Sequence, residues 1–377
     1  MAKKSLWYSL EVGVRFILRW LSYILTATTT LLYIGSAFSP YIPPKLFSPA
    51  ALLGLFFPLA FVGQLLAWSY WLVRRRWRIL IGLSLIFAFS WESIYSYMPL
   101  HRGLSRQLEE YQGPRLKVLS YNVCGFGFEH HGSQRPNKVL LYLKSSEADL
   151  ICLQEASLAQ DKDWGVTMGQ VKAYLGKKYP YISLIPAQDG GSGLMLLSRY
   201  PIKEAERIPI PSRTNGAAHF KINIGGQETH VINVHLESFR LSKALGQEYM
   251  SLVAKGKAFE FQDALRSKFT PIFHHHERQA NIVKRYADSL QTERLIICGD
   301  FNDTPVSYAH EKLERDMTDA FIKAGNGLGY SFVSRTFLVR IDHILLGKAF
   351  TPYYTKVDAG VKGSDHYPIF TYIKPTE

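Results

Sequence analysis

The chain has 377 residues, with 44 Lys and Arg against 31 Asp and Glu, which gives a formal net charge of +13. This length allows two or three domains, and 47% hydrophobic residues exclude a chain that is disordered throughout. Residues 1–100 hold nine basic and two acidic side chains, so they carry +7 and the remaining residues carry +6. Positive charge is therefore concentrated at the start of the chain and is weak evidence for a nucleic-acid partner.

Two long uncharged runs, residues 20–38 and 46–73, occupy much of the first hundred residues. Each can cross a hydrocarbon core, which takes about 20 helical residues, and each exceeds the apolar region of about 7–15 residues in a cleavable signal peptide. A third run starts at residue 79, is interrupted by Glu92 and continues to residue 100. We expect an uncleaved membrane anchor in residues 1–100, with the lipid bilayer as its partner and spans at about 16–38, 46–73 and 77–98.

Basic residues predict the orientation of these spans, because Lys and Arg are enriched in cytoplasmic flanks. They cluster before the first span and between the second and third: Lys3, Lys4, Arg15, Arg19, Arg74, Arg75, Arg76 and Arg78. Only Lys45 lies between the first and second spans. If all three spans cross, the N-terminus is cytoplasmic and the chain after about residue 100 is extracytoplasmic. If the third run lies only in the interface, the chain after it is cytoplasmic.

Residues 101–114 are polar and are predicted to be a linker, followed by a separate domain over residues 115–377. Short runs rich in Val, Ile and Leu predict buried strands at 116–123, 149–154, 193–198, 229–236, 294–298, 341–346 and 368–373. Helical periodicity predicts helices at 137–147, 167–178, 241–267, 274–291 and 317–324. Strands and helices that alternate without a fixed repeat favour a layered α/β sandwich.

Acidic, amide and imidazole side chains follow several of the predicted strands. They are Asn122, Glu155, His235, Asp300, Asn302, Asp342, Asp365 and His366. Each one alone is explained as well by a turn or a cap, but together they supply hard oxygen ligands and two imidazoles. Mg²⁺ and Mn²⁺ prefer such oxygens, whereas Zn²⁺ favours Cys and clustered His. The set suits metal-assisted attack of water on a phosphate ester.

Seven motifs occur in a fixed order along the predicted domain: SYNV, LQE, GSGLMLLSRYPI, INVHLES, GDFND, RIDHIL and SDHYPI. In this order they resemble the endonuclease/exonuclease/phosphatase superfamily over roughly residues 115–374. The resemblance implies a four-layer α-β-β-α sandwich with two mixed sheets packed face to face. Here that fold would be preceded by an all-α transmembrane segment of about three helices.

The resemblance also implies a metal site for Mg²⁺ or Mn²⁺. Glu155 would be the principal ligand, with Asn122 and Asp365 close to the ion or to the phosphate. Arg199 matches the family as well, and it is left open between a phosphate contact and an internal salt bridge.

Five further residues receive catalytic roles from the same resemblance. Asp300 and Asn302 would position and activate the attacking water. His366 would face the scissile phosphate and be oriented by Asp342, a pairing that favours the protonated imidazole. His235 would contact the phosphate.

These observations predict a membrane-anchored, divalent-metal-dependent phosphohydrolase, in the first place a phosphodiesterase or nuclease. One alternative is a phosphatase or phosphodiesterase that acts on a phospholipid or inositol phosphate at the bilayer. Another is a membrane scaffold that binds phosphorylated ligands without turnover. The complete set of site residues argues against this scaffold. No protein partner is inferred.

Residues 238–273 carry a net charge of +3 and several aromatic side chains. They are expected to form either a basic, aromatic flap over the site or at the membrane, or an amphipathic helix packed on the sandwich. The run His274, His275 and His276 is expected at the surface near a helix start, since consecutive helical residues point about 100° apart and cannot easily share an ion.

Overall fold

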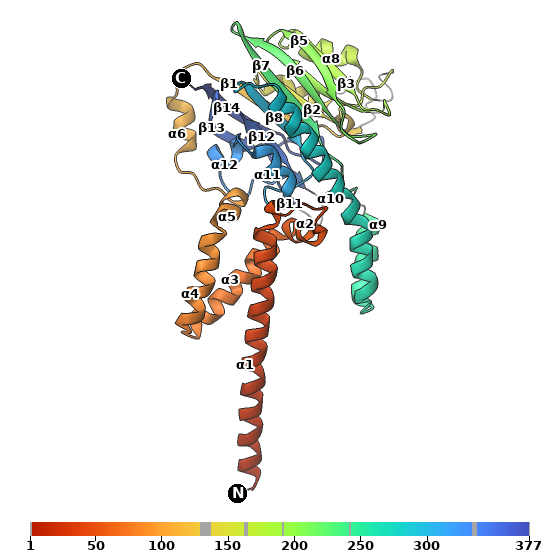
Figure 1. Ribbon diagram of the computed structural model, residues 1–377. Helices are drawn as coiled ribbons and strands as arrows, with labels where there is room; N and C mark the ends of the chain where they lie inside the picture. The colour runs from red at the N-terminus through yellow and green to blue at the C-terminus, as the bar shows by residue number, and fades with distance from the viewer. Residues whose placement is uncertain are drawn as a thin grey trace.

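In a computed structural model of the chain, residues 2–128, 137–161, 165–190, 192–240, 243–333 and 338–376 are described. Two mixed sheets of six strands pack face to face, with helices on both outer sides (Figure 1). The first sheet has the order β13 (Phe350–Val357), β14 (Ile369–Pro375), β1 (Leu116–Asn122), β2 (Leu150–Gln154), β4 (Gly193–Ser198) and β3 (Tyr181–Pro186). The second has the order β5 (Ile202–Ile208), β6 (Gly216–Ile224), β7 (Gln227–His235), β8 (Leu295–Asp300), β12 (Asp342–Leu346) and β9 (Thr318–Asp319). A separate ribbon pairs β10 (Phe332–Val333) with β11 (Leu338–Val339).

Alternation along the strands builds the layers, because successive side chains of a strand face opposite sides of its sheet. In β1, Val118 joins the core between the sheets, whereas Leu119 faces the outer helices. Helices α7 (Lys138–Ser145) and α8 (Met168–Leu175) cover the first sheet. Helices α10 (Ala258–Ser289) and α11 (Tyr308–Glu314) cover the second. The predicted four-layer α-β-β-α sandwich is confirmed.

All seven predicted strands are present, but two of the predicted helices have other bounds and one helix of the sandwich was missed. Helix α9 (Lys243–Ala254) ends before Gly256, whose φ of +65° supplies the left-handed turn that stops a helix. Helix α10 then runs through Pro271, where the sequence predicted a break. Phe269 and Phe273 pack in a cluster on that stretch, and this tertiary packing keeps the helix continuous despite the missing backbone N–H. Helix α12 (Ala320–Ala324) lies near its predicted place, while α11 was not predicted.

The N-terminal segment consists of α1 (Ala2–Ala37), η1 (Ser39–Tyr41), α2 (Ser48–Leu55), α3 (Phe57–Val73), α4 (Trp77–Phe89) and α5 (Trp91–Tyr97). Within α1, Glu11–Ala37 is long and apolar enough to cross a membrane. The second and third predicted spans are not straight helices, because α2 meets α3 at 73° and α4 meets α5 at 60°. Among the described residues there is thus one helix that could span, or three spans if each bent pair counts as one.

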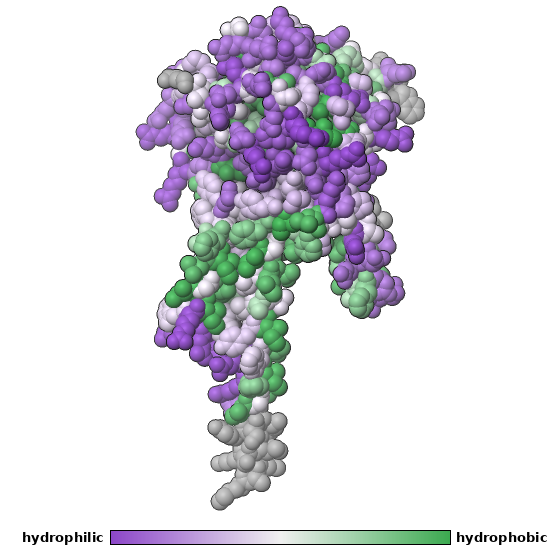
Figure 2. All heavy atoms as spheres, in the orientation of Figure 1, coloured by the Kyte–Doolittle hydropathy of each residue, from purple (hydrophilic) through white to green (hydrophobic). Residues whose placement is uncertain are grey.

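Apolar side chains gather on α1, α3 and α4, which project away from the hydrophilic sandwich (Figure 2). Between the two parts, residues 101–114 contain a short helix, α6 (Leu104–Glu110), which lies beside β13.

The N-terminal segment contacts the sandwich at the loops around β8 and β12. Ser39 Oγ donates to the carbonyl of Val306, at 3.3 Å, in the loop that follows β8. Arg340, just before β12, is 1% exposed and donates to the carbonyls of Ser96 and Tyr97 at the end of α5. The apolar helices are therefore tied to the edge of the sandwich where β8 ends and β12 begins.

The described part of residues 238–273 differs from an amphipathic helix packed on the sandwich, while a flap at the membrane stays a prediction. Phe239, Phe269 and Phe273 form a cluster with Leu52 and Leu55 of α2, so these three side chains pack against the N-terminal segment, whereas Phe259 is 87% exposed. Helix α9 and the first part of α10 project on the same side of the sandwich as α1 (Figure 1).

Candidate active site

The predicted polar residues meet at one edge of the sandwich. Strands β1 and β2 are parallel, and so are β7 and β8, so the carboxyl ends of each pair share an edge. Because the sheets pack face to face, the two edges bring together Asn122 and Glu155 from one sheet with His235 and Asp300 from the other. Antiparallel β12 starts at this edge with Asp342, which pairs in register with Asp300.

Asp300 lies at the centre of the group and is fully buried. Its Oδ2 accepts a hydrogen bond from Asn122 Nδ2 at 3.0 Å, and its Oδ1 accepts one from the backbone N–H of Asn302 at 2.8 Å. Oδ2 also lies 3.6 Å from Nε2 of His235 and 3.6 Å from Nε2 of His366. Burial raises the pKa of Asp300 above its usual range, and the charge of His366 opposes that shift.

The backbone around these carboxylates is held in sparsely populated conformations. Glu155 and Asn302 both have φ of +50°, a region that non-glycine residues seldom adopt and that is often found at functional sites. Gly299 has φ of +145°, and a Cβ there would lie 1.9 Å from the carbonyl oxygen of Val234. Only glycine fits this position, which explains the residue that precedes Asp300 in GDFND.

The two imidazoles are in different protonation states. His366 Nδ1 donates to Asp342 Oδ2 at 2.8 Å; burial opposes its charge, but the charges of Asp342 and Asp300 outweigh it and raise the pKa of His366 to about 10. Burial lowers the pKa of His235, against the charge of Asp300, and Asn215 Nδ2 donates to His235 Nε2 at 2.9 Å. At neutral pH, His366 is an imidazolium and His235 is a neutral acceptor.

Glu155 and Asp365 form the accessible part of the site. The side chain of Glu155 is 34% exposed, and its Oε1 accepts from Asn122 Nδ2 at 3.1 Å. Asp365 is exposed. Both carboxylates lie near Cys124. Burial of this thiol, together with the charges of Asp365 and Glu155, raises its pKa to about 12. A thiol with this pKa is not a nucleophile at neutral pH.

These oxygens fit a hard divalent cation. Glu155 and Asp365 supply carboxylates that reach solvent, and one oxygen of Asp342 is buried without a hydrogen-bond partner among the described residues. Asn122 differs from a simple ligand, since its amide nitrogen faces Glu155 and Asp300 while its oxygen accepts from Cys124 N at 3.1 Å. Asn122 therefore orients the carboxylates of Glu155 and Asp300.

Three residues that support the site were missed in the sequence. Asn215 donates to the Leu236 carbonyl as well as to His235. Ser364 accepts from the backbone of His366 and donates to the carbonyl of Asn122, and Ser331 Oγ accepts from the backbone of Asp342. Ser364 belongs to the SDHYPI motif and could have been found there, but Asn215 and Ser331 stand in no recognisable pattern.

Arg199 is not brought to the site. It follows β4 and pairs with Asp149 at 3.0 Å and Glu147 at 3.1 Å, at the end of β2 opposite to Glu155. Six residues of extended chain separate Asp149 from Glu155, about 20 Å. The structure therefore supports the internal salt bridge and not the phosphate contact.

The Arg199→Gln variant is accordingly expected to keep kcat and KM within about twofold of the wild type, because no contact with a reacting group is removed. It should unfold at a slightly lower temperature, since the Asp149 carboxylate loses its ion pair with Arg199. Steady-state kinetics on any accepted phosphate ester would check this, and a tenfold rise in KM would restore the phosphate-contact interpretation.

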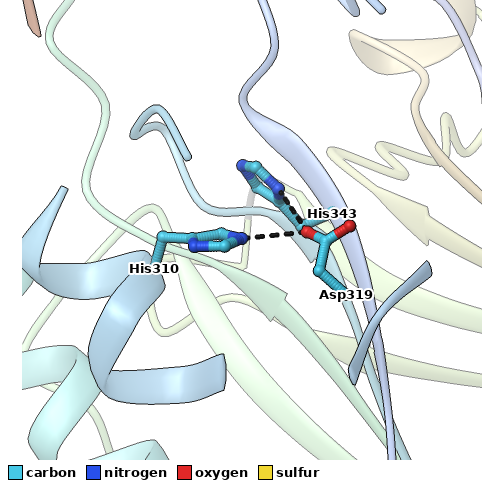
Figure 3. Close-up of side chains that lie close together, drawn as sticks. All are labelled: His310, Asp319 and His343. Atoms are coloured by element: carbon cyan, nitrogen blue, oxygen red, sulfur yellow. Dashed lines mark hydrogen bonds and ion pairs between the residues drawn. The ribbon is translucent and has the colours of Figure 1, made fainter. Parts of the chain in front are cut away.

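A second buried group of His and Asp residues lies behind the site. Asp319 Oδ2 is 2.9 Å from His310 Nε2 and 3.3 Å from His343 Nδ1, so that both rings point at one oxygen (Figure 3). The other ring nitrogens also face acceptors, His310 Nδ1 at 3.3 Å from Glu314 and His343 Nε2 at 3.1 Å from the carbonyl of Asp303. Every ring nitrogen thus faces an acceptor inside this buried network of ionisable groups, and the contact of His343 with the Asp303 carbonyl holds the residue next to Asn302.

The expectation for the three consecutive histidines was wrong. They lie in the middle of α10, and His276 is 1% exposed. Its Nδ1 is 3.0 Å from Asp303 Oδ2 and its Nε2 is 2.6 Å from the Glu237 carbonyl, so it ties α10 to the loop after β8. His274 contacts the carbonyl of Pro44, and His275 is exposed.

Comparisons with known proteins agree with this architecture. The fold resembles an endonuclease/exonuclease/phosphatase protein from Bacteroides vulgatus (16% identity, 70% of this chain and 100% of the other, TM-score 0.50). It also resembles the human nocturnin catalytic domain with bound sulfate (16% identity, 70% and 94%, TM-score 0.50). Residues 16–97 match a domain of unknown function, DUF8431. Residues 119–366 match the Endonuclease/Exonuclease/phosphatase family, and the chain belongs to that family.

Proposed function

We propose that this chain is a membrane-anchored, divalent-metal-dependent phosphohydrolase that cleaves a phosphodiester by attack of water. The observation that carries the proposal is Asp300, a buried carboxylate that lies 3.6 Å from a protonated and from a neutral imidazole. Family membership supports the phosphoester bond class.

The proposed roles follow from the hydrogen bonds. Asp300, oriented by Asn122 and Asn302, accepts a proton from the attacking water. His366, whose Nδ1–H is held by Asp342, presents its Nε2–H to a phosphoryl or leaving oxygen. His235 is proposed to lie beside the phosphate as a neutral imidazole that Asn215 orients.

Glu155 and Asp365 would hold Mg²⁺ or Mn²⁺ beside Asn122, which keeps Glu155 in place. When bound, such an ion neutralises charge on the phosphoryl oxygens. The carboxylates that surround the site would otherwise repel an anionic substrate.

A second candidate substrate class is favoured by the placement of the site. Val306, four residues after Asn302, contacts Ser39, and Arg340, two residues before Asp342, contacts the end of α5. The catalytic edge is therefore tied to the apolar helices, so that a phospholipid or inositol lipid in the bilayer is a candidate beside nucleic acid. The cytoplasmic N-terminus and the extracytoplasmic catalytic part remain predictions from the basic flanks.

Purified full-length protein should be given plasmid DNA, RNA, sphingomyelin and phosphoinositides with Mg²⁺, and again with EDTA. We expect hydrolysis of one class with Mg²⁺, loss of that activity in EDTA, and recovery when Mg²⁺ is restored. Activity that persists in EDTA would contradict the metal dependence. Cleavage of no class by folded protein would favour the non-catalytic scaffold.

A further inference from the structure

A basic groove of about 390 Å³ lies between α10, α11 and the loop that precedes α2. Five cationic side chains and one carboxylate line it: Lys45, Arg278, Lys284, Arg285, Lys312 and Asp288. None of them belongs to the proposed catalytic site. The groove thus concentrates positive charge at a place that the proposed reaction does not use.

Most of this charge is not compensated within the described part of the chain. Lys284 is buried and pairs with Asp288 and, at 3.7 Å, with Asp316. The structure shows no ion pair for the side chains of Lys45, Arg278, Arg285 or Lys312 among the residues that it describes. Like charges held in one groove repel each other, so an anion there would be stabilised by all four.

The spacing of the two arginines suits a single polyatomic anion. Arg278 and Arg285 are seven residues apart on α10, which places them on one face about 10 Å apart along the axis. Both are exposed, and a guanidinium presents its donors in a planar fork that matches phosphate oxygens. Lys45 and Lys312 reach the same groove from two other elements.

The groove lies where the apolar helices join the sandwich. The backbone N–H of Lys45 donates to Glu277 Oε2 at 2.7 Å, one residue before Arg278, and His274 contacts the carbonyl of Pro44 at 3.2 Å. The loop that holds Lys45 begins just after the candidate span Glu11–Ala37. Figure 2 shows hydrophilic residues over α10 and α11 directly beside the apolar helices. With Glu11–Ala37 in a bilayer, the groove lies at the level of the headgroups.

We propose that this groove binds the phosphate of an anionic phospholipid headgroup. The site is independent of the proposed hydrolysis and rests only on membrane attachment through the N-terminal segment. Binding there fixes α10 and α11 against the membrane surface, and His276 of α10 in turn contacts Asp303 beside the catalytic loop.

The test uses the full-length protein in neutral detergent, titrated with dioctanoyl phosphatidylglycerol, dioctanoyl phosphatidylcholine or inorganic phosphate. An apparent Kd is taken from the shift in unfolding temperature. We expect saturable binding of phosphatidylglycerol, at least tenfold tighter than phosphatidylcholine or phosphate. The Arg278→Gln/Arg285→Gln double variant should bind it about 30-fold more weakly, as expected for two charges removed beside the bound anionic headgroup.

A matched control is Lys177→Gln/Lys203→Gln, which removes two exposed charges outside the groove. This control should bind as the wild type does. If the double variant and the control bind phosphatidylglycerol with equal affinity, the groove is not the binding site. If the wild type binds inorganic phosphate as tightly as phosphatidylglycerol, the ligand is not specifically a lipid. The single variants replace the double variant if it unfolds without lipid at a lower temperature. No outcome depends on turnover, so failure of the catalytic proposal leaves this test intact.

Discussion

The Asp300→Asn variant is expected to lose phosphoester hydrolysis by about 10²- to 10⁴-fold, the usual contribution of a positioned general base. Asparagine has nearly the same shape, but its single oxygen can accept only one of the two hydrogen bonds that Asp300 accepts, from Asn122 and from the backbone of Asn302. What it cannot do is take a proton or balance the charge of His366, 3.6 Å away. The loss of activity should therefore fall on kcat, and the lost hydrogen bond should lower the unfolding temperature by a few degrees.

Steady-state kinetics and thermal unfolding of purified protein would measure both effects. The matched control is Asp263→Asn, the same substitution at an exposed residue of α10, which should keep wild-type kcat. His366→Ala should give a loss of similar size, because it removes the imidazolium that Asp342 orients. Wild-type turnover in either Asp300→Asn or His366→Ala would remove the basis of the proposed mechanism.

Much of the fold could be predicted because the central strands are buried on both faces. Strand β8, Leu295–Asp300, is buried throughout and reads as an unbroken apolar run that ends in a carboxylate. Strand β5 was missed for the opposite reason, since it is an edge strand with five consecutive exposed residues, and its sequence IKEAERI has no apolar run.

The sequence predicted which residues belong to the candidate site, but not which of them contact each other. The sequence placed Asn122 and Asp300 at strand ends, yet their contact joins residues that are 178 apart in the chain. The packing of one sheet on the other decides that contact, and no local pattern reports it. The same holds for His310, Asp319 and His343, which come from three separate elements, and of which only His343 lies in a motif, RIDHIL.

The buried network around Asp319 leads to the largest expected change in stability. Asp319 is 1% exposed, and its Oδ2 contacts His310 and His343 while its Oδ1 accepts from the first backbone N–H groups of α12. Asp319→Asn can keep this helix cap but places an amide N–H against two imidazoles. Removing one partner of a buried charge pair usually costs about 3–5 kcal/mol, so the unfolding temperature should fall by roughly 10 °C.

The pH dependence of this difference follows from two opposite pKa shifts. Burial opposes the charge of Asp319, but its interactions with His310 and His343 outweigh burial and hold its pKa well below the usual range. The contribution of Asp319 to folding stability is therefore present above about pH 4 and is lost as the pH falls through its pKa in the folded protein. Burial also opposes the charge of His310, but Glu314 and Asp319 outweigh burial and raise its pKa. The contribution of His310 to folding stability is therefore complete below about pH 6.5 and is lost as the pH rises.

The wild type should therefore exceed Asp319→Asn in stability most between about pH 4 and 6.5, with a smaller difference on either side. Denaturant unfolding at a series of pH values would measure it. Asp316→Asn is the matched control, because this nearby carboxylate is 75% exposed and its ion pair with Lys284 is long, at 3.7 Å. A difference below 1 kcal/mol at pH 5.5, or one that does not vary with pH, would mean that Asp319 and His310 do not carry the charges assigned to them.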